Sequence, residues 1–402
     1  MEASTDQTYR LTMHEEKRLK ILFLPFWYPN EDNPAAGIFV KEHAKAAALY
    51  NDVVVLYSRK VGKGVKGLYE TVSDEKEAGI RTIRVKYRRS PIPKTSDFIH
   101  LCSVFAAFKK LLKQRWRPDI IHAHVYSAGV LAILLGKRYK IPVVISEHWS
   151  GFIRRTLKKI HILKARFAMN KANIILPVSN HLQDAIKSYG IKNKFKVIPN
   201  PINTTTFRPP SRPKVDGKKN ILFVGAIVPI KGIVVLLRAL AQLKEKRQDF
   251  VLDIVGDGPN RKEYEDLSKE SGLEHLVKFY GFKTKEEVAD FMKNCDFLVQ
   301  PSLYETFGIT YCEAMACGKP VVASQLPSLQ EKITEDRGVL VPPKDADALA
   351  DAIDYMLDHH KDYSPRKIRG YVKDEFSHEV VAKQLNEIYR QILQSHITNY
   401  IA

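Results

Sequence analysis

The chain contains little cysteine, and the cysteines it has are not arranged as ligands. Four are present among 402 residues: Cys102, Cys295, Cys312 and Cys317. They include no Cys-x-x-Cys pair and lie near no histidine at zinc-binding spacing. A disulfide scaffold and a zinc finger are therefore excluded, and we expect reduced cysteines in the core.

Long apolar runs are also missing. No window holds the roughly 18 uninterrupted apolar residues that a membrane-spanning helix needs. The first 18 residues are polar and include acids, so they lack the apolar centre of a secretory signal. We expect a cytoplasmic protein with a disordered leader over residues 1–18.

Acidic residues are scarce in two parts of the first half. The range 81–117 holds eleven Lys or Arg against Asp97 alone, and the range 154–171 holds seven with no acid. The whole chain carries a net charge of +19. Such a field attracts the phosphates of nucleotides, anionic lipids or nucleic acids, although charge runs are equally typical of a solvated surface. Because the aromatic and basic modules of nucleic-acid-binding proteins are not evident, we expect no nucleic-acid partner.

What the sequence does contain is a repeated alternation of strands and helices. Short β-branched runs alternate with longer segments of helical period, which is the pattern of parallel βαβ units. At 402 residues the chain is too long for one hydrophobic core. We therefore predict an α/β fold of two doubly wound, Rossmann-like domains that face each other across a cleft. The predicted strands begin at Lys20, Asp52, Ile83, Asp119, Pro142, Asn173 and Phe195, and then at Asn220, Phe250, Val277, Asp296, Lys319 and Gly338. Helices are predicted over 37–50 and 98–114 and from Lys231, Arg261, Thr284, Ile309 and Asp345.

A segment rich in Pro and Thr, residues 201–220, separates the two series of strands. It has no periodic apolar face, so we interpret it as a linker. The first domain is accordingly placed at 19–202 and the second at 203–377. A last amphipathic segment, 378–402, is expected to cross back to the first domain.

Two acids flank a break between a predicted strand and a predicted helix. Glu305 lies before Phe307-Gly308, and Glu313 lies within the helix that follows. Two carboxylates can then flank one small molecule, while the free N–H groups of Phe307, Gly308 and Ile309 face an anion. This arrangement suits a phosphate-bearing ligand that also offers hydroxyls, such as a nucleotide sugar. The spacing taken alone favours two surface acids near a helix start, and the neighbouring loops shift the interpretation towards a binding site.

Three other strand ends in the second half carry loops of a ligand-binding type. Lys231 follows a strand in "VGAIVPIKG" and can neutralise a phosphate. Gly256 and Gly258 form a tight turn in "VGDGPN", where backbone can approach a ligand. Phe279 is followed by Gly281 at the end of another strand.

These motifs resemble the donor-binding domain of the retaining glycosyltransferases of family 4, which have the GT-B fold. Glu305 and Glu313 match the family's Glu-x7-Glu, Lys231 its phosphate-binding lysine, and Gly256, Gly258 and Pro259 its donor loop. The resemblance extends from Lys20 to the last helix and is more specific in the second half. It makes the first domain the acceptor side and the second the donor side.

The resemblance also implies roles for individual residues. Glu305 would hold hydroxyls of the donor sugar and Glu313 those of the ribose, while backbone near Phe279 and Gly281 would read the base. His148, just past a strand end and facing the cleft, would hydrogen-bond the donor sugar. The implied catalytic residues are Glu305, His148 and Lys231. The implied donor-binding residues are Gly37, Gly225, Lys231, Gly256, Gly258, Pro259, Phe279, Gly281, Glu305, Phe307, Gly308, Ile309 and Glu313.

Some positions in the first half allow two interpretations. Gly37 matches a glycine whose backbone approaches the diphosphate, but with Asn33-Pro34 it is equally ordinary turn punctuation. His122 and His124 share one face of a strand, and we favour a structural role over catalysis for both. Trp149 fits a sugar-stacking residue and a core residue equally.

One position departs from the family pattern. Ala226 stands where the family usually has an Arg that pairs with the diphosphate beside the lysine. The loss of that cation weakens charge compensation for the leaving group. Either another basic residue from the first half substitutes, or turnover is slow or absent.

The function that the resemblance implies is retaining transfer of a sugar from a nucleotide-diphosphate sugar to a hydroxyl acceptor. The acceptor would be a glycan, a small molecule or a lipid-linked compound, in cell-surface polysaccharide or glycolipid synthesis. No Asp-x-Asp pair precedes the donor loops, so we expect no metal and no other cofactor. The basic first domain suggests an anionic membrane surface as a partner, at the inner face of the membrane. The alternatives are a sugar-nucleotide epimerase or hydrolase and a non-catalytic sugar-nucleotide-binding protein.

Overall fold

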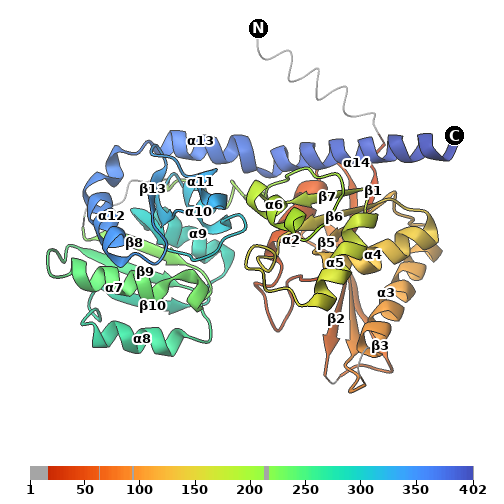
Figure 1. Ribbon diagram of the computed structural model, residues 1–402, viewed down its shortest axis with the longest axis horizontal. Coiled ribbons are helices and arrows are strands. Elements are labelled where there is room, and N and C mark those ends of the chain that lie inside the picture. The colour runs from red at the N-terminus through yellow and green to blue at the C-terminus, as the bar shows by residue number, and fades with distance from the viewer. Residues whose placement is uncertain (1–16, 63, 93–94, 212–216, 402) are drawn as a thin grey trace, which may run out of the picture.

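A computed structural model describes residues 17–62, 64–92, 95–211 and 217–401, with side chains up to residue 396. The predicted leader therefore lies almost entirely outside the described residues. Two α/β units lie side by side, and a long C-terminal helix runs from the second over the first (Figure 1). The predicted α/β architecture of two doubly wound sheets is confirmed.

The first sheet has seven strands in the order β3-β4-β2-β1-β5-β6-β7. All its neighbours are parallel except β3, which pairs antiparallel with β4 at one edge. Its strands are β1 (Lys20–Pro25), β2 (Asp52–Val61), β3 (Tyr69–Glu77), β4 (Ile80–Arg88), β5 (Ile120–His124), β6 (Val143–Glu147) and β7 (Ile174–Pro177). Its helices are α2 (Ile38–Ala47), α3 (Thr95–Lys113), α4 (Tyr126–Tyr139), α5 (Lys159–Lys171) and α6 (Asn180–Ser188).

The second sheet has six parallel strands in the order β10-β9-β8-β11-β12-β13. This is the strand order of the dinucleotide-binding Rossmann fold, and the first sheet without β3 repeats it. Its strands are β8 (Lys219–Val224), β9 (Phe250–Val255), β10 (Val277–Gly281), β11 (Phe297–Gln300), β12 (Val321–Ser324) and β13 (Gly338–Val341). Its helices are α7 (Ile233–Leu243), α8 (Arg261–Glu270), α9 (Lys285–Asn294), α10 (Ile309–Ala316), α11 (Pro327–Gln330), α12 (Ala346–His359) and α13 (Pro365–Phe376), with 3-10 turns η1 (Pro229–Lys231) and η2 (His360–Asp362).

Burial explains why the central strands are mainly apolar and carry polar residues only towards their carboxyl ends. Every residue of β5, β6, β11 and β12 is buried, because helices cover both faces of a parallel sheet. The described cysteines carry no disulfide. Cys295, Cys312 and Cys317 are buried as expected, whereas Cys102 is only partly buried.

Three sequence predictions need correction. The strand expected from Phe195 is absent, and that segment makes only an isolated bridge between Ile175 and Phe195. Strand β3 was not predicted, because its charged and half-exposed residues have no apolar face. The helix expected from Lys231 begins at Ile233, since Gly232 adopts a left-handed φ of 72° and ends the 3-10 turn first.

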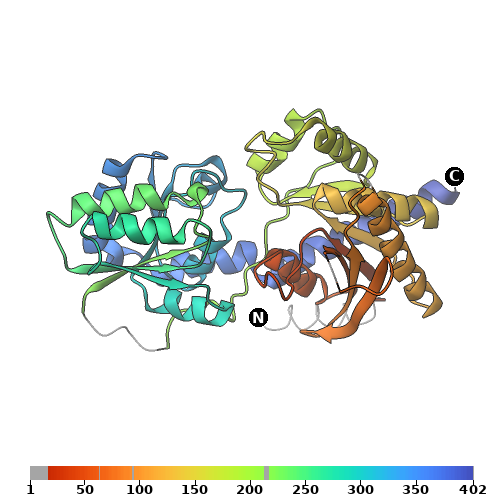
Figure 2. The same ribbon diagram turned by 90° about the horizontal axis from the view of Figure 1, so that it is seen from below.

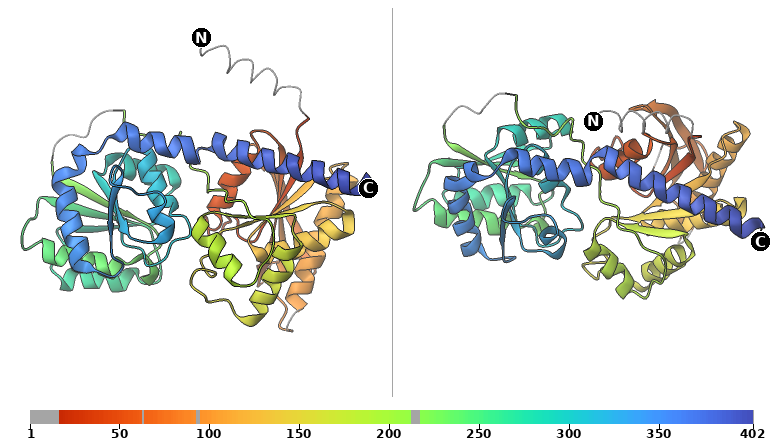
Figure 3. Two further views of the ribbon diagram at one scale, coloured as in Figure 1. Left: turned by 45° about the horizontal axis from the view of Figure 1, so that its top comes forward. Right: turned by 90° about the horizontal axis from the view of Figure 1, so that it is seen from above.

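The chain crosses between the two units twice, at neighbouring points. The Ile202 N–H donates to the Phe376 carbonyl at 2.7 Å, so the linker lies beside the junction of α13 and α14 (His378–Ile401). Helix α14 then packs along α2 and over the first sheet (Figures 1 and 3). Arg369 on α13 donates to the carbonyls of Thr204 and Phe207, which ties the linker to the second unit.

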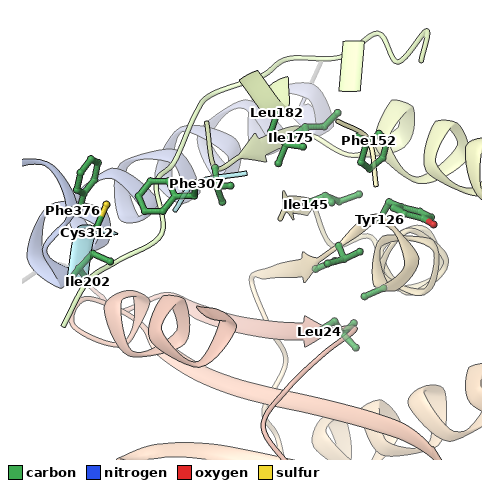
Figure 4. Packing of buried hydrophobic residues seen from close by; sticks show 14 of the residues in the cluster. Leu24, Tyr126, Ile145, Phe152, Ile175, Leu182, Ile202, Phe307, Cys312 and Phe376 are labelled. Atoms are coloured by element: carbon green, nitrogen blue, oxygen red, sulfur yellow. The ribbon is translucent and has the colours of Figure 1, made fainter. Parts of the chain in front are cut away.

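Apolar side chains of both units form one buried cluster near this crossing. Phe307 and Phe376 pack edge to face with ring centroids 5.3 Å apart, and Ile202 from the linker lies beside them (Figure 4). Leu182 and Ile175 continue the cluster into the first unit. No helix within the described ranges is long and apolar enough to cross a membrane.

Candidate functional site

The strand order of the second sheet identifies where a ligand would bind. Strands β9 and β10 follow β8 on one side of it in the sheet, whereas β11, β12 and β13 lie on the other side of β8. In such sheets ligands bind beyond the carboxyl ends of the strands where the strand order reverses. The loops after β8 and β11 carry Lys231 and Glu305 respectively, so both predicted residues lie at that point.

Lys231 and Glu305 form an ion pair. The Lys231 Nζ lies 2.5 Å from the Glu305 Oε1, and both side chains are largely buried. The Ser302 hydroxyl donates to the same Oε1 at 3.0 Å, and the Ser328 hydroxyl donates to the Glu305 carbonyl at 2.8 Å. The carboxylate and the ammonium are therefore held in position, and a ligand phosphate can compete for the lysine.

Glu313 lies on α10, which begins at Ile309. The preceding residue, Gly308, has a left-handed backbone conformation with a φ of 83°. The Glu313 carboxylate is 3.7 Å from Lys285, which begins α9. Burial is the largest effect on Glu313 and raises its pKa from the ordinary 4.5 to about 7, although the Lys285 ammonium opposes this. This carboxyl group therefore titrates near neutral pH.

The loop between the two acids is anchored by its aromatic side chain. Phe307 is 2 % exposed, and the Lys332 ammonium lies 4.5 Å from the centroid of its ring. The side chain thus faces the core. The first amides of α10 have no intrahelical partner and can meet an anion. Contact of the Phe307 to Ile309 backbone with a donor stays a prediction.

The glycines at three strand ends pack against each other. The Gly225 N–H donates to the Val255 carbonyl at 3.0 Å, and the Gly256 N–H donates to the Gly281 carbonyl at 2.9 Å. A Cβ on Gly256, whose φ is 140°, would lie 1.9 Å from the Gly225 carbonyl oxygen. Packing alone therefore requires glycine at position 256, whatever ligand binds there.

The remaining second-domain candidates lie around this turn. A Cβ on Gly258 would lie 2.3 Å from the Ile227 carbonyl oxygen, so this loop is tightly packed, and Pro259 follows it. The Phe279 carbonyl faces the Arg261 guanidinium at 3.5 Å, two residues before the end of β10 at Gly281.

No basic side chain occupies the place of the expected arginine within the loop itself, where Ala226 is exposed. A cation from the first domain approaches the neighbouring loop instead. The Arg154 guanidinium lies 5.9 Å from the centroid of the Tyr304 ring, and Tyr304 directly precedes Glu305.

In the first domain, Gly37 is required by the backbone around it. It begins α2 with a φ of 62°, and a Cβ there would lie 2.1 Å from the Trp27 carbonyl oxygen. Close packing of the loop after β1 therefore accounts for this glycine without a ligand.

His148 follows β6 but its ring is buried rather than open to the space between the domains. It is 7 % exposed and stacks 4.5 Å from Phe39. Its Nε2 is 3.1 Å from the His124 Nδ1, and its Nδ1 is 3.1 Å from the Asn200 Oδ1. The same Asn200 oxygen is 3.1 Å from the His43 Nε2. These three imidazoles form one buried chain that includes Asn200, the residue directly before the linker.

Burial sets the protonation of this histidine chain. Loss of solvent lowers the pKa of His43 to about 4 and lowers those of His124 and His148 well below the ordinary value. The rings are therefore neutral at physiological pH. His122 is fully buried between the Tyr389 hydroxyl at 2.6 Å and the Ser146 hydroxyl at 2.8 Å, which supports its structural interpretation.

Contacts between the domains involve residues that sequence reasoning missed. The Ser179 hydroxyl at the start of α6 donates to the Thr306 carbonyl at 2.6 Å, directly beside Glu305. Lys285 bridges Glu313 to the buried Glu42 on α2, at 3.4 Å from Glu42. No local motif marks these residues, because each pairs with a partner far away in the sequence.

Comparison with known proteins adds family matches over both halves. A model described as "Glycosyltransferase Family 4" matches residues 40–206, and one described as "Glycosyl transferases group 1" matches residues 205–390. An uncharacterized glycosyltransferase of Methanocaldococcus jannaschii is 31% identical over 294 residues, which are 68% of this chain and 75% of that protein. The glycogen synthase of Mycobacterium tuberculosis is 26% identical over 394 residues, 92% of this chain and 94% of the relative.

Solved structures match over nearly the whole chain. A sucrose-phosphate synthase from Thermosynechococcus elongatus superposes with a TM-score of 0.76 at 26% identity, covering 94% of this chain and 100% of that one. The Anabaena protein HepE, solved with UDP and glucose, gives a TM-score of 0.72 at 20% identity, covering 93% and 100%.

Proposed function

The chain belongs to glycosyltransferase family 4 and has the GT-B fold, and from this premise we propose that it transfers a sugar from a nucleotide-diphosphate sugar to a hydroxyl acceptor with retention at the anomeric carbon. One observation carries the proposal. The Lys231 ammonium and the Glu305 carboxylate meet at 2.5 Å where the strand order of the second sheet reverses. A diphosphate needs the cation, and sugar hydroxyls need the carboxylate.

The chain's own groups supply the chemistry of leaving-group departure. Lys231 and the first amides of α10 would stabilise the negative charge that grows on the diphosphate. Closure of the domains would exclude water and bring the loop that begins at His148 towards the donor sugar. The departing phosphate takes the acceptor's proton on the same face, so this route requires neither a protein base nor a metal.

Donor and acceptor classes form the finer part of the proposal. The fold neighbour HepE was solved with UDP-glucose, which makes that compound a reasonable first donor to test. The +19 charge and the cations of the first domain support an acceptor that is anionic or carried by a lipid, at the cytoplasmic face of a membrane. Such an acceptor would fit synthesis of cell-surface polysaccharide or glycolipid.

The test measures binding and turnover of one preparation against UDP-, GDP- and ADP-sugars. We expect micromolar to millimolar binding of one donor by calorimetry, acceptor-dependent release of nucleotide, and an unchanged anomeric configuration by NMR. Turnover should persist in a chelator, and its complete loss there would exclude the metal-free route. Free sugar released without any acceptor would instead indicate a hydrolase or epimerase. Binding without turnover would indicate a non-catalytic sensor, the function that Ala226 keeps open.

A further inference from the structure

The outer face of α5 carries an exposed apolar stripe. Ile160, Leu163 and Phe167 are 55%, 60% and 38% exposed. Their spacing of three and four residues places them on one side of the helix, whereas the residues on the other side, such as Ala165 and Met169, are buried. The segment around α5 forms an outer layer of the first domain (Figure 2). Contiguous exposed apolar side chains on one helix face mark an interaction surface.

A second element extends the stripe. Phe98, in the first turn of α3, is 64% exposed. The neighbouring Asp97 pairs with Lys164 of α5 at 3.1 Å, which links the first turn of α3 to α5. We define the α5 patch as Phe98, Ile160, Leu163 and Phe167.

The charges around the α5 patch identify its partner. Residues 148–183 contain seven Lys or Arg and no acid. The exposed cations among them are Arg154, Arg155, Lys158, Lys159, Arg166 and Lys171. Asp97 is the acid beside the patch, and Lys164 neutralises it. A second copy of this chain would bring these cations face to face, which costs free energy. Apolar side chains surrounded by cations match an anionic lipid surface. The apolar side chains contact acyl chains there, and the cations contact the anionic headgroups.

We propose that the α5 patch docks the first domain on an anionic lipid leaflet. Large side chains enter the boundary of headgroups and acyl chains, and the surrounding lysines and arginines contact phosphates. Helix α5 follows β6 through the loop that begins at His148 and contains Arg154, so docking places the candidate site close to the membrane. The proposal rests on the proposed function only in making the acceptor lipid-borne, because docking itself does not require a donor.

The experiment measures cosedimentation of the full chain with phosphatidylcholine vesicles, with or without about one third phosphatidylglycerol. We expect binding to the anionic vesicles that weakens with added salt. The triple variant Ile160→Ser, Leu163→Ser, Phe167→Ser should bind at least about thirty-fold more weakly. The charge variant Lys158→Gln, Lys159→Gln should lose roughly twenty-fold while keeping the apolar stripe. The matched control Tyr355→Ser, at a residue 49% exposed in the second domain, should bind like the wild type.

Three results would overturn the proposal. One is equal vesicle binding by the wild type and the triple variant. Another is binding that ignores phosphatidylglycerol and salt. The third is a wild-type dimer and a monomeric triple variant in analytical ultracentrifugation without vesicle binding, which would assign the patch to a second copy. Donor binding in the absence of vesicles is measured on every variant. If the wild type binds no donor, the proposed function is refuted but the docking proposal is not. If a variant binds the donor but no longer binds vesicles, the variant is folded.

Discussion

Lys231 and Glu305 are 74 positions apart in the chain and 2.5 Å apart in space. At the scale of single residues, this pair is the chemical basis of the candidate site. The glutamate holds the lysine where a phosphate would bind, and the lysine holds the glutamate where hydroxyls would bind. Each side chain thus positions the other before any ligand arrives.

Removing either member should therefore cost more than one contact. We expect Lys231→Met and Glu305→Gln each to lower kcat about a hundredfold or more, with Lys231→Met also weakening donor binding. The double variant should lose less than the product of the two effects, since the groups act together. Steady-state kinetics with the best donor measure this.

The control for that pair is another lysine bonded to an acid. Lys262 and Asp266 on α8 lie 2.6 Å apart at the surface, so Lys262→Met should leave kcat unchanged. A Lys231→Met enzyme that keeps more than half of its activity would contradict the role assigned to the pair.

A second residue-scale prediction concerns pH. Burial raises the pKa of Glu313 to about 7, so its ionised fraction rises from roughly a tenth at pH 6 to nine tenths at pH 8. If the carboxylate accepts ribose hydroxyls, donor affinity should rise up to about tenfold over this range, and Glu313→Gln should remove the dependence. Calorimetry at several pH values measures donor affinity in the wild type and in Glu313→Gln. Equal pH profiles for the two would contradict the role assigned to Glu313.

The stability of the folded protein depends on the Glu313 proton in the opposite direction: donor affinity should rise with pH, whereas this contribution to stability falls. The pKa of Glu313 in the folded protein lies above its ordinary value of 4.5, so the folded state binds the proton more tightly. This contribution to stability is fully present below pH 4.5 and is lost as pH rises through about 7. Unfolding by urea at pH 6 and pH 8, in the wild type and in Glu313→Gln, isolates it.

At the scale of elements, the ends of β8, β9 and β10 determine the shape of the candidate site in the second domain. Gly256 is the tightest point, because an added Cβ would meet the Gly225 carbonyl oxygen at 1.9 Å. We expect Gly256→Ala to lower the free energy of unfolding by about 3 kcal/mol. Urea titration followed by circular dichroism measures the change.

Gly370 provides the matched substitution within α13. An added Cβ there meets nothing within 4 Å, so Gly370→Ala should raise stability by about 0.5–1 kcal/mol through helix propensity. Equal effects of the two substitutions would show that close packing at the strand ends is not the cause.

At the scale of the whole molecule, the second domain lacks a cation at Ala226 and the first domain brings one close. Arg154 lies over Tyr304, beside Glu305. If Arg154 compensates the negative charge of the leaving group after the domains close, Arg154→Met should lower kcat about tenfold and change donor affinity little. The neighbouring exposed Arg155→Met serves as the control, and equal kinetics of both variants would assign Arg154 to the surface. A soluble acceptor keeps vesicle docking out of this measurement.

The site was predictable where its signals are local. Glu305, Glu313, Lys231 and the glycine turns follow predicted strands, and parallel strands bring their carboxyl ends to one edge. Strand β3 was missed because its charged face contacts solvent, and the strand at Phe195 was wrongly predicted from an apolar run that forms one bridge. Lys285, Ser179 and Asn200 carry no local signal, since their partners lie far away in sequence.

By itself the sequence determined two doubly wound sheets and the loops that carry the candidate site residues, because the period of apolar residues and the position of turns are properties of short segments. Tertiary structure alone decided which charges meet across the two domains, that the ring of His148 is buried in a chain with His124 and Asn200, and that the apolar stripe of α5 faces outward. Those outcomes depend on contacts between distant segments, and such contacts exist only once the chain has folded.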